Sequence, residues 1–441
     1  MCRALHLGAI FAAALAVLGA VEAHAAEPKP RVIEVTNPEF RAFPLAVSET
    51  KNLDSAPLTE AMKTITDVLR WDLDTSLLFR VLDPRSYLPD PAKESLVASA
   101  IDFDAWLNVG AEGLVKAAAL ESSTQITVDF RYYDVTSRRQ LLQKRYEAPP
   151  DQARVLAHRF ADDIVEFLTG KKGIFRTKLV AVRKLRDSRE VWMLDMDGHD
   201  LKRLTSNNVI NTLPSWFPSG KRVLFTSFMQ GNPSLYAVST SGGRPQVISA
   251  RQGLNVGAAA SPDGSRIALT MTVDGNSEIY TMAPDGSRPR RLTDHWAIDS
   301  SPTWSPDGRR IAFVSARFGD PQIFVMNADG TEPRRLTDRG TYNTTPDWSP
   351  RGDVIAFTAR DERNVFDIFT VDVATREIRR LTQDQGNNEE PSFSPDGNLI
   401  AFTSTREGRS QLWLMGLDGS QQRRLTKAGG FITPAWSPYF E

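Results

Sequence analysis

A short phrase recurs six times in the second half of the sequence and restricts the fold to a repeating architecture. Residues 301–315 read SPTWSPDGRRIAFVS, and variants of the core phrase P-x-W-S-P-D-G occur along the chain. The period is about 44 residues, with the aromatic position at Trp216, Ala260, Trp304, Trp348, Phe393 and Trp436. Such spacing is typical of a protein built from copies of one supersecondary unit.

Each repeat has the pattern of four strands. A second strand begins about seven residues after the aromatic position, a third about twelve residues later, and a fourth lies in RLT-like segments about thirteen residues further on. Runs such as IAFVS (311–315) and IFVMN (323–327) are almost continuously apolar, as expected of strands covered on both faces. Asp-Gly pairs between the strands favour tight hairpins. Each repeat is therefore predicted to be a four-stranded antiparallel sheet.

The two ends of the repeat region complement each other. Residues 178–205 supply three strands without a preceding W-S-P-D-G phrase, whereas residues 433–441 supply a first strand alone. We expect the C-terminal strand to join the sheet that begins at Lys178 and to close a β-propeller of six blades. Closure in this way leaves no open sheet edge between the first and last blades.

The tryptophans and the S-P-D-G aspartates of the repeat are expected to have structural roles. Tryptophan buries a large apolar area where neighbouring sheets meet. The aspartate is replaced by Ser219, Arg351 and Tyr439 in three repeats, which a metal site would not tolerate. Asp in this position is explained by turn formation.

The chain begins with the pattern of a secretory signal. Arg3 precedes an apolar run (9–21), and an A-H-A cleavage pattern ends at Ala25, so we expect residues 1–25 to be removed. No later stretch contains about 20 consecutive apolar residues, the length that spans a bilayer. The single cysteine, Cys2, lies in the removed segment. The mature protein is therefore predicted to be exported and not membrane-spanning.

The region between the signal and the repeats lacks the repeated phrase and has a different pattern of apolar residues. Residues 58–73 and 151–170 have the apolar spacing of amphipathic helices, and the segments between them alternate as strands. The fold class is therefore multidomain, an N-terminal α/β domain followed by an all-β six-bladed propeller closed by the C-terminal strand. The predicted parts are a signal peptide (1–25), an extended N-terminal segment (26–36), an α/β domain (37–170), a linker (171–177) and the propeller (178–441).

The extended segment 26–36 has the features of an interaction strand. Pro28 and Pro30 disfavour a helix, and the run from Val32 to Val35 has strong β propensity. Such a strand can pair with its own domain or with the open sheet edge of another protein. The sequence leaves both alternatives open.

The sequence predicts no catalytic site. The net charge of −1 gives no indication of nucleic-acid binding, and no G-x-S-x-G elbow or glycine-rich phosphate loop occurs. The mature histidines, His158, His199 and His295, have no metal-ligand spacing, so no metal ligands are predicted. No cofactor is expected. The alternative function is that of an exported propeller enzyme or sugar-binding module, which would use the central channel and inward carboxylates around calcium.

The loops that enter the innermost strands are the best candidates for an interaction face. They carry small and polar residues beside larger neighbours such as Trp296, a composition that suits protein recognition at a concave centre. The candidate residues are Leu254, Gly257, His295, Asp299, Ser300, Ser301, Tyr342, Thr344, Thr345, Glu389, Glu390 and Thr433.

These features together resemble the TolB family of periplasmic components of the Tol–Pal system. The resemblance rests on the leader, the α/β domain, the junction FLTGKKGIFRTKLVAV (167–182), the six blades and the terminal PAWSPY (434–439), and it covers essentially the whole mature chain. It implies a non-enzymatic adaptor in the Gram-negative periplasm that links TolA to the lipoprotein Pal. The implied role is to maintain outer-membrane integrity and to support envelope constriction during cell division.

The resemblance also implies which residues contact each partner. Pal would dock over the propeller mouth, with Leu254, Gly257, Ser300 and Ser301 among its contacts. Where the family pattern can carry histidine this chain has Leu254, and the neighbouring strand has Ala260 in place of the aromatic residue. The C-terminal domain of TolA would bind the mature leader at Arg31, Val32, Ile33, Glu34 and Val35.

Overall fold

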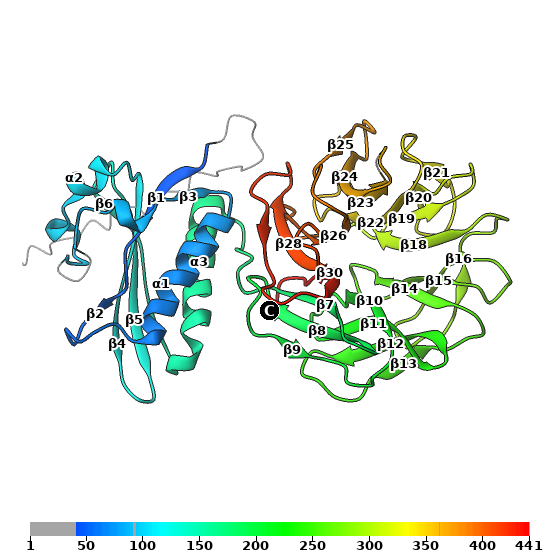
Figure 1. Cartoon of the computed structure of the whole chain (residues 1–441), viewed down its shortest axis with the longest axis horizontal. Helices are drawn as coiled ribbons and strands as arrows, with labels where there is room; N and C mark the ends of the chain where they lie inside the picture. The colour runs from blue at the N-terminus through cyan, green and yellow to red at the C-terminus, as the bar shows by residue number, and fades with distance from the viewer. Residues whose placement is uncertain (1–40, 91–93, 361, 441) are drawn as a thin grey trace, which may run out of the picture.

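The computed structural model describes residues 41–90, 94–360 and 362–440 and contains two domains side by side (Figure 1). One domain is a sheet covered by two long helices, and the other is a ring of six four-stranded sheets. This architecture confirms the predicted fold class. The predicted signal peptide (1–25) and extended segment (26–36) lie outside the described residues. No helix in the described ranges has the length and apolar character needed to cross a membrane.

The sheet of the N-terminal domain mixes parallel and antiparallel pairs. Its order is β3-β1-β4-β5-β6, and β2 also pairs with β4. Strand β1 is parallel to β3 and β4, whereas β4, β5 and β6 form an antiparallel meander. The strands are β1 (Phe43–Val47), β2 (Lys51–Asn52), β3 (Phe79–Val81), β4 (Gly113–Glu121), β5 (Ile126–Asp134) and β6 (Arg139–Ala148).

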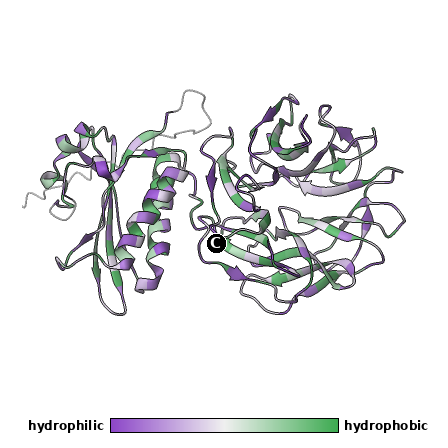
Figure 2. Ribbon diagram, viewed as in Figure 1, coloured by the Kyte–Doolittle hydropathy of each residue, from purple (hydrophilic) through white to green (hydrophobic). Residues whose placement is uncertain are grey.

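Helices α1 (Glu60–Thr75) and α3 (Ala153–Thr169) lie between this sheet and the propeller (Figure 1). Both are striped with hydrophilic and hydrophobic residues (Figure 2), the pattern of helices that bury one face. The ring of Phe160 on α3 stacks on Phe130 of β5, with centroids 4.8 Å apart. A short helix, α2 (Phe103–Asn108), precedes β4. The two long helices thus carry the sheet on one side and meet the propeller on the other.

Five sheets of the propeller are formed by consecutive strands, each an antiparallel meander. Their fourth strands lie in the RLT-like segments and are only two to four residues long. The strands are β10 (Asn211–Trp216), β11 (Arg222–Gln230), β12 (Asn232–Ser239) and β13 (Gln246–Ser249); β14 (Asn255–Ala260), β15 (Ile267–Met271), β16 (Glu278–Met282) and β17 (Arg290–Arg291); β18 (Asp299–Trp304), β19 (Arg310–Ser315), β20 (Gln322–Asn327) and β21 (Arg334–Arg335); β22 (Asn343–Trp348), β23 (Val354–Arg360), β24 (Phe366–Asp372) and β25 (Ile378–Arg380); and β26 (Asn388–Phe393), β27 (Leu399–Ser404), β28 (Gln411–Gly416) and β29 (Arg423–Arg424).

The sixth sheet joins the two ends of the propeller. Its order is β30 (Phe431–Trp436), β7 (Lys178–Lys184), β8 (Arg189–Asp195) and β9 (Lys202–Arg203), and β30 runs antiparallel to β7 with Trp436 opposite Leu179. The amide of Ser437 donates to the carbonyl of Lys178 at 2.9 Å, and the amide of Lys178 donates to Ser437 Oγ at 3.0 Å. The predicted closure by the C-terminal strand is confirmed.

The repeated tryptophans join neighbouring sheets. Trp216, Trp304, Trp348 and Trp436 are buried. The indole N–H of Trp216 donates to the carbonyl of Ala435 on β30, and that of Trp304 donates to the carbonyl of Ala259 on β14. Each of these two side chains therefore fills space between two sheets and satisfies its one donor on the neighbouring strand.

The segment predicted as a linker is packed between the domains. Ile174 and Phe175 are buried, and the carboxylate of Asp162 on α3 accepts hydrogen bonds from the amide of Phe175 at 2.9 Å and from Arg176 Nε at 2.7 Å. A Cβ added at Gly173 would lie 2.3 Å from Asp162 Oδ1, so this close approach requires glycine. The segment is therefore a fixed connection between the domains.

Replacing Trp436 with alanine should lower the free energy of unfolding by about 3–5 kcal/mol. The side chain is only 7% exposed, and its indole N–H donates to Thr177 Oγ1 at 2.8 Å, so the substitution leaves a cavity at the closing strand. Equilibrium unfolding in urea measures the change. Trp296, which is 79% exposed, is the matched control, and its replacement should change stability by less than about 0.5 kcal/mol. Equal losses in the two variants would contradict this prediction.

Candidate interaction face of the propeller

The six innermost strands form a ring, because each contacts the innermost strands of both neighbouring sheets. All six contain a register shift against the second strand of their sheet at the same place. One residue at each shift has a positive φ between 48° and 61°. These bulge residues are Leu213, Gly257, Ser301, Thr345, Glu390 and Thr433. Five of the six are residues that the sequence predicted for the interaction face, all but Leu213.

The bulges have a local cause in the sequence. Proline follows the bulge residue in five of the strands, and proline cannot donate a hydrogen bond to the sheet, so it is tolerated at such irregularities. A left-handed conformation costs a non-glycine residue about 1–2 kcal/mol. Only Gly257 adopts it without this cost. The surrounding structure must therefore hold the other five bulges in place.

Hydrogen bonds from the bulge residues to threonine hydroxyls supply part of this restraint. The amide of Ser301 donates to Thr270 Oγ1 at 3.1 Å, and that of Glu390 donates to Thr358 Oγ1 at 2.9 Å. In each case the threonine belongs to the second strand of the preceding sheet. The bulges thus connect neighbouring sheets around the centre of the ring and give the propeller mouth a fixed backbone.

Two carboxyl groups of the inner strands have strongly raised pKa values. Burial raises the pKa of Glu390 to about 7, although its Oε2 accepts hydrogen bonds from the amide of Thr433 at 2.6 Å and from Thr403 Oγ1 at 2.9 Å. Burial also raises the pKa of Asp347 to about 7, and its Oδ2 accepts from the amide of Phe393 at 2.7 Å. Both carboxyls connect one inner strand to the next.

Glu390 is also one of the groups that could hold a cation in the channel. Its carboxylate, that of Glu389 and the hydroxyls of Ser301, Thr345 and Thr433 are oxygen donors, the class that Ca²⁺ requires. Glu390 Oε2, however, already accepts two hydrogen bonds from the protein. The ring therefore matches calcium in donor type, but Glu390 Oε2 is already occupied, and calcium in the channel stays an untested alternative to the expected absence of a cofactor.

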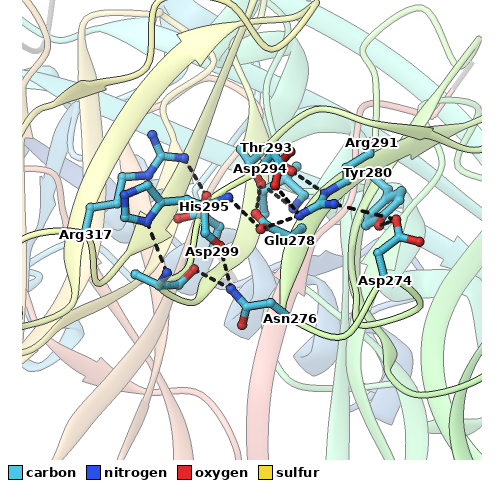
Figure 3. A network of polar contacts seen from close by, with 12 residues as sticks. Asp274, Asn276, Glu278, Tyr280, Arg291, Thr293, Asp294, His295, Asp299 and Arg317 are labelled. Atoms are coloured by element: carbon cyan, nitrogen blue, oxygen red, sulfur yellow. Dashed lines mark hydrogen bonds and ion pairs between the residues drawn. The ribbon is translucent and has the colours of Figure 1, made fainter.

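A buried acid holds the loop 294–298, which leads to the inner strand β18 (Figure 3). Glu278, at the start of β16, is completely buried. Its carboxylate accepts hydrogen bonds from Arg291 Nη2 at 2.8 Å, Thr293 Oγ1 at 2.6 Å and the amide of His295 at 2.8 Å. Arginine and threonine of the RLT-like segment thus bind the same acid in this sheet.

The rest of the loop is held equally firmly. Asn276 Nδ2 donates to the carbonyls of His295 and Ala297, both at 2.8 Å, and His295 Nδ1 accepts the amide of Ala297 at 3.1 Å. Asp299, which begins β18, pairs with Arg317 Nη2 at 2.6 Å. The loop therefore has a defined shape before any partner arrives.

The same arrangement recurs in other sheets. Glu190 on β8 accepts from Arg203 Nη2 at 2.9 Å and from the amide of Asn208 at 2.9 Å. Asp367 on β24 accepts from Thr382 Oγ1 at 2.6 Å and from Asn388 Nδ2 at 3.0 Å. Each acid is fully buried and paired with cationic or hydroxyl donors. These groups serve structure, and their role is to fix the loops around the mouth.

The predicted face residues divide by exposure. Leu254 and Tyr342 are exposed, each at 37%. Asp299 is completely buried and Thr433 is 5% exposed, so these two support the face from below and do not form its surface. The remaining candidates are partly exposed, namely Gly257, His295, Ser300, Ser301, Thr344, Thr345, Glu389 and Glu390. The predicted leader residues 31–35 lie outside the described part of the chain.

An apolar group lies at the rim, and the sequence pointed only to its tryptophan, as a larger neighbour of the face. Trp296, Ile298 and Phe318 are 79%, 56% and 70% exposed, and we call them the apolar edge. They belong together because the amide of Ala316, two residues before Phe318, donates to the carbonyl of Ile298 at 3.1 Å. The only sequence signal for Phe318 is a large apolar residue inside a polar turn. Its proximity to Ile298 depends on the pairing of neighbouring loops.

Comparison with known proteins agrees with this architecture. Residues 165–440, more than half of the chain, match the TolB beta propeller domain, and residues 31–141 match the TolB amino-terminal domain. The chain is 44% identical over 229 residues to the Tol-Pal system protein TolB of Anaeromyxobacter sp. (strain K), covering 52% of each chain. It is also 44% identical over 207 residues to the corresponding protein of Myxococcus xanthus (strain DK1622). The chain spans about half the length of the curated relatives it matches.

A solved structure resembles the chain over most of its length. The crystal structure of TolB from Acinetobacter baumannii has a TM-score of 0.79 and 26% sequence identity, and the match covers 91% of this chain and 98% of that chain. The fold and the loop face define a two-domain protein in which an α/β domain precedes a closed six-bladed propeller. The two family matches make the classification specific: the chain belongs to the TolB family.

The pH dependence of stability tests the environment of Glu390. The folded protein holds the carboxyl proton with a pKa of about 7, against an ordinary value of 4.5, so this group favours folding below about pH 4.5. That contribution is lost as the pH rises to about 7. Glu390→Gln removes the titration. The stability of this variant relative to the wild type should therefore rise between these pH values and then level off.

Urea unfolding of both proteins across this pH range measures the difference. Glu60→Gln is a suitable control, because the side chain of Glu60 is 89% exposed. A stability difference for Glu390→Gln that does not vary with pH would contradict the prediction.

Proposed function

We propose that this protein is a non-enzymatic periplasmic adaptor that links TolA to the lipoprotein Pal. In this proposal the propeller face binds Pal, and the mature leader at residues 31–35 binds the C-terminal domain of TolA. The adaptor would thereby help to maintain outer-membrane integrity and support envelope constriction during division. Membership of the TolB family and the Tol-Pal names of its relatives support the proposal.

The observation that carries the proposal is the apolar edge beside a rigid polar ring. Trp296, Ile298 and Phe318 expose large apolar side chains, and the bulge residues next to the channel offer hydroxyl, amide and carboxyl groups. Interfaces commonly combine a few aromatic anchors with polar groups that fix orientation. Because Glu278 and Asn276 hold the loop in place, little conformational entropy is lost when a protein docks there.

The acidic groups of the inner strands are engaged in hydrogen bonds within the protein, which favours a role in binding over one in catalysis. The carboxyls of Glu390 and Asp347 accept hydrogen bonds from backbone amides of the next inner strand. In the described part of the chain, the one cluster with three metal-binding side chains lies at the domain junction and includes none of the ring residues. An exported propeller enzyme or sugar-binding module remains the alternative, and it requires a ligand retained in the channel.

The leader and the face belong to one chain, so their binding equilibria can be coupled. We propose that the leader alternates between packing on its own protein and pairing with TolA, and that Pal binding biases this equilibrium. Thermodynamic linkage then requires TolA to change the affinity for Pal by the same factor. The packed connection at Phe175 and Arg176 gives the two domains the fixed relation that such coupling needs.

Deletion of residues 26–36 should weaken binding to the C-terminal domain of TolA at least about tenfold, a loss of about 1.4 kcal/mol. The physical reason is the loss of the strand that supplies main-chain hydrogen bonds. Isothermal titration calorimetry with the purified TolA domain measures it. The deletion variant should still bind Pal, which controls for folding, and an unchanged affinity for TolA would exclude the leader's role.

Replacing Trp296 with alanine should weaken Pal binding about 30-fold, because exposed aromatic anchors at interfaces contribute about 2 kcal/mol or more. Arginine at Ser300, Thr344 or Glu389 should also weaken the complex through bulk and charge at the ring. Leu88→Ala is the matched control, since Leu88 is 67% exposed on the α/β domain. Titration calorimetry with soluble Pal measures all five variants. Wild-type affinity in all four face variants would rule out this face as the docking site.

A further inference from the structure

A group of buried and partly buried polar side chains lies where the two domains meet. Asp72 comes from α1 and His158 from α3, whereas Asp195 and Asp197 come from the end of β8 and the turn that follows it. One ring nitrogen of His158 and one carboxylate oxygen each of Asp195 and Asp197 all lie within 4.8 Å of one another. Three potential ligand atoms from two domains therefore converge on one point.

The hydrogen bond on the other side of the imidazole orients His158. Its Nδ1 lies 2.7 Å from Asp72 Oδ2, and Asp72 is completely buried. When Asp72 is ionised, its carboxylate accepts the proton of Nδ1 and leaves the lone pair of Nε2 pointing the opposite way. Histidines that bind metals almost always donate their second ring N–H to a carboxylate, a carbonyl or water in this manner.

The nitrogen that faces the carboxylates has no hydrogen-bond partner. The side chain of His158 is 4% exposed, its Nε2 is buried without a hydrogen bond, and Asp197 Oδ2 lies 3.5 Å away. A cation placed between this unpartnered nitrogen and the carboxylate of Asp197 would interact favourably with both.

We propose that His158, Asp195 and Asp197 bind one divalent metal ion of the Zn²⁺ class at the junction between the α/β domain and the propeller. One imidazole nitrogen and two carboxylate oxygens form a donor set that Zn²⁺ accepts. A fourth position is available to water or to His199, whose Nδ1 is 3.4 Å from Asp197 Oδ1. Asp72 would be the outer carboxylate that orients His158.

Two cations already touch these carboxylates and must share them with the metal. Arg154 Nη2 contacts Asp197 Oδ2, and Lys178 Nζ contacts Asp195 Oδ1. Both side chains are partly exposed, at 25% and 28%, so they can move toward solvent when an ion binds.

A cavity beside the cluster gives an ion access. Its volume is about 350 Å³, and its lining includes Arg154, Asp197, His199 and Lys427. It therefore provides a route to Asp197 and space into which Arg154 can move.

A metal at this place would connect the two domains. His158 lies on the helix that packs against the N-terminal sheet. Asp195 ends β8 of the sheet that closes the propeller, and Asp197 lies in the turn after it. The ion would thereby hold the α/β domain against the closing blade. The sequence predicted no metal ligands because the histidine and the aspartates lie in different elements of different domains, without any recognisable spacing.

Zinc titration of the full mature chain tests the proposal. The protein is treated with chelator, dialysed and titrated with ZnCl₂ by isothermal titration calorimetry. We expect one high-affinity Zn²⁺ per chain and a higher melting temperature with excess zinc. Asp72→Asn should weaken zinc binding about 10–100-fold, as expected of an orienting carboxylate. His158→Gln should lower the affinity at least as much, and His295→Gln is the matched control that should leave it unchanged.

Cobalt provides a second measurement that does not depend on the stability of the variants. Co²⁺ added to the wild type should give visible absorption bands of a four- or five-coordinate site, and Zn²⁺ should abolish them. Absence of stoichiometric Zn²⁺ binding by the wild-type protein would overturn the proposal and leave a metal-free ion-pair cluster. Equal affinity in folded His158→Gln and His295→Gln variants would overturn it as well.

Discussion

The pairing of β30 with β7 is the interaction on which the rest of the structure depends. It joins residues from opposite ends of the propeller region and converts an open row of sheets into a ring. Trp436 lies opposite Leu179 at this seam and binds Thr177 of the interdomain connection. This seam therefore closes the ring, packs its core and attaches the α/β domain. Without that seam the inner strands would have no common centre around which to present their loops.

Within the closed ring, buried polar groups determine the shape of the surface. The bulge residues are held by threonines of the preceding sheet, and acids such as Glu278 hold the loops that lead into the inner strands. In a buried environment a fully satisfied polar network favours a single arrangement, because each unpaired group would cost free energy. Buried hydrogen bonds beneath the proposed docking face thus keep that face rigid. The apolar edge is the part of this surface that remains free for a partner.

Much of the fold could be predicted, because each sheet is a local repeat of hairpins and its strands are marked by period, turn residues and apolar runs. The candidate site could be predicted only in part. Ser301 and Thr345 follow from their place before a proline, but Asp299 proved to be a buried partner of Arg317. Its burial depends on the side chains that surround it in three dimensions. Phe318 joins the apolar edge only because its loop pairs with that of Ile298.

The sequence by itself determined the number of blades, the strand order within them and the presence of a preceding α/β domain, since these depend on contacts between residues close in the chain. Only the tertiary structure decided which polar residues face solvent, which carboxyls of the inner strands have raised pKa values, and that His158 meets Asp195 and Asp197. Those properties depend on contacts between distant segments. Burial and ion pairing depend on which residues the closed ring and the packed connection bring close together. No local sequence pattern encodes those contacts.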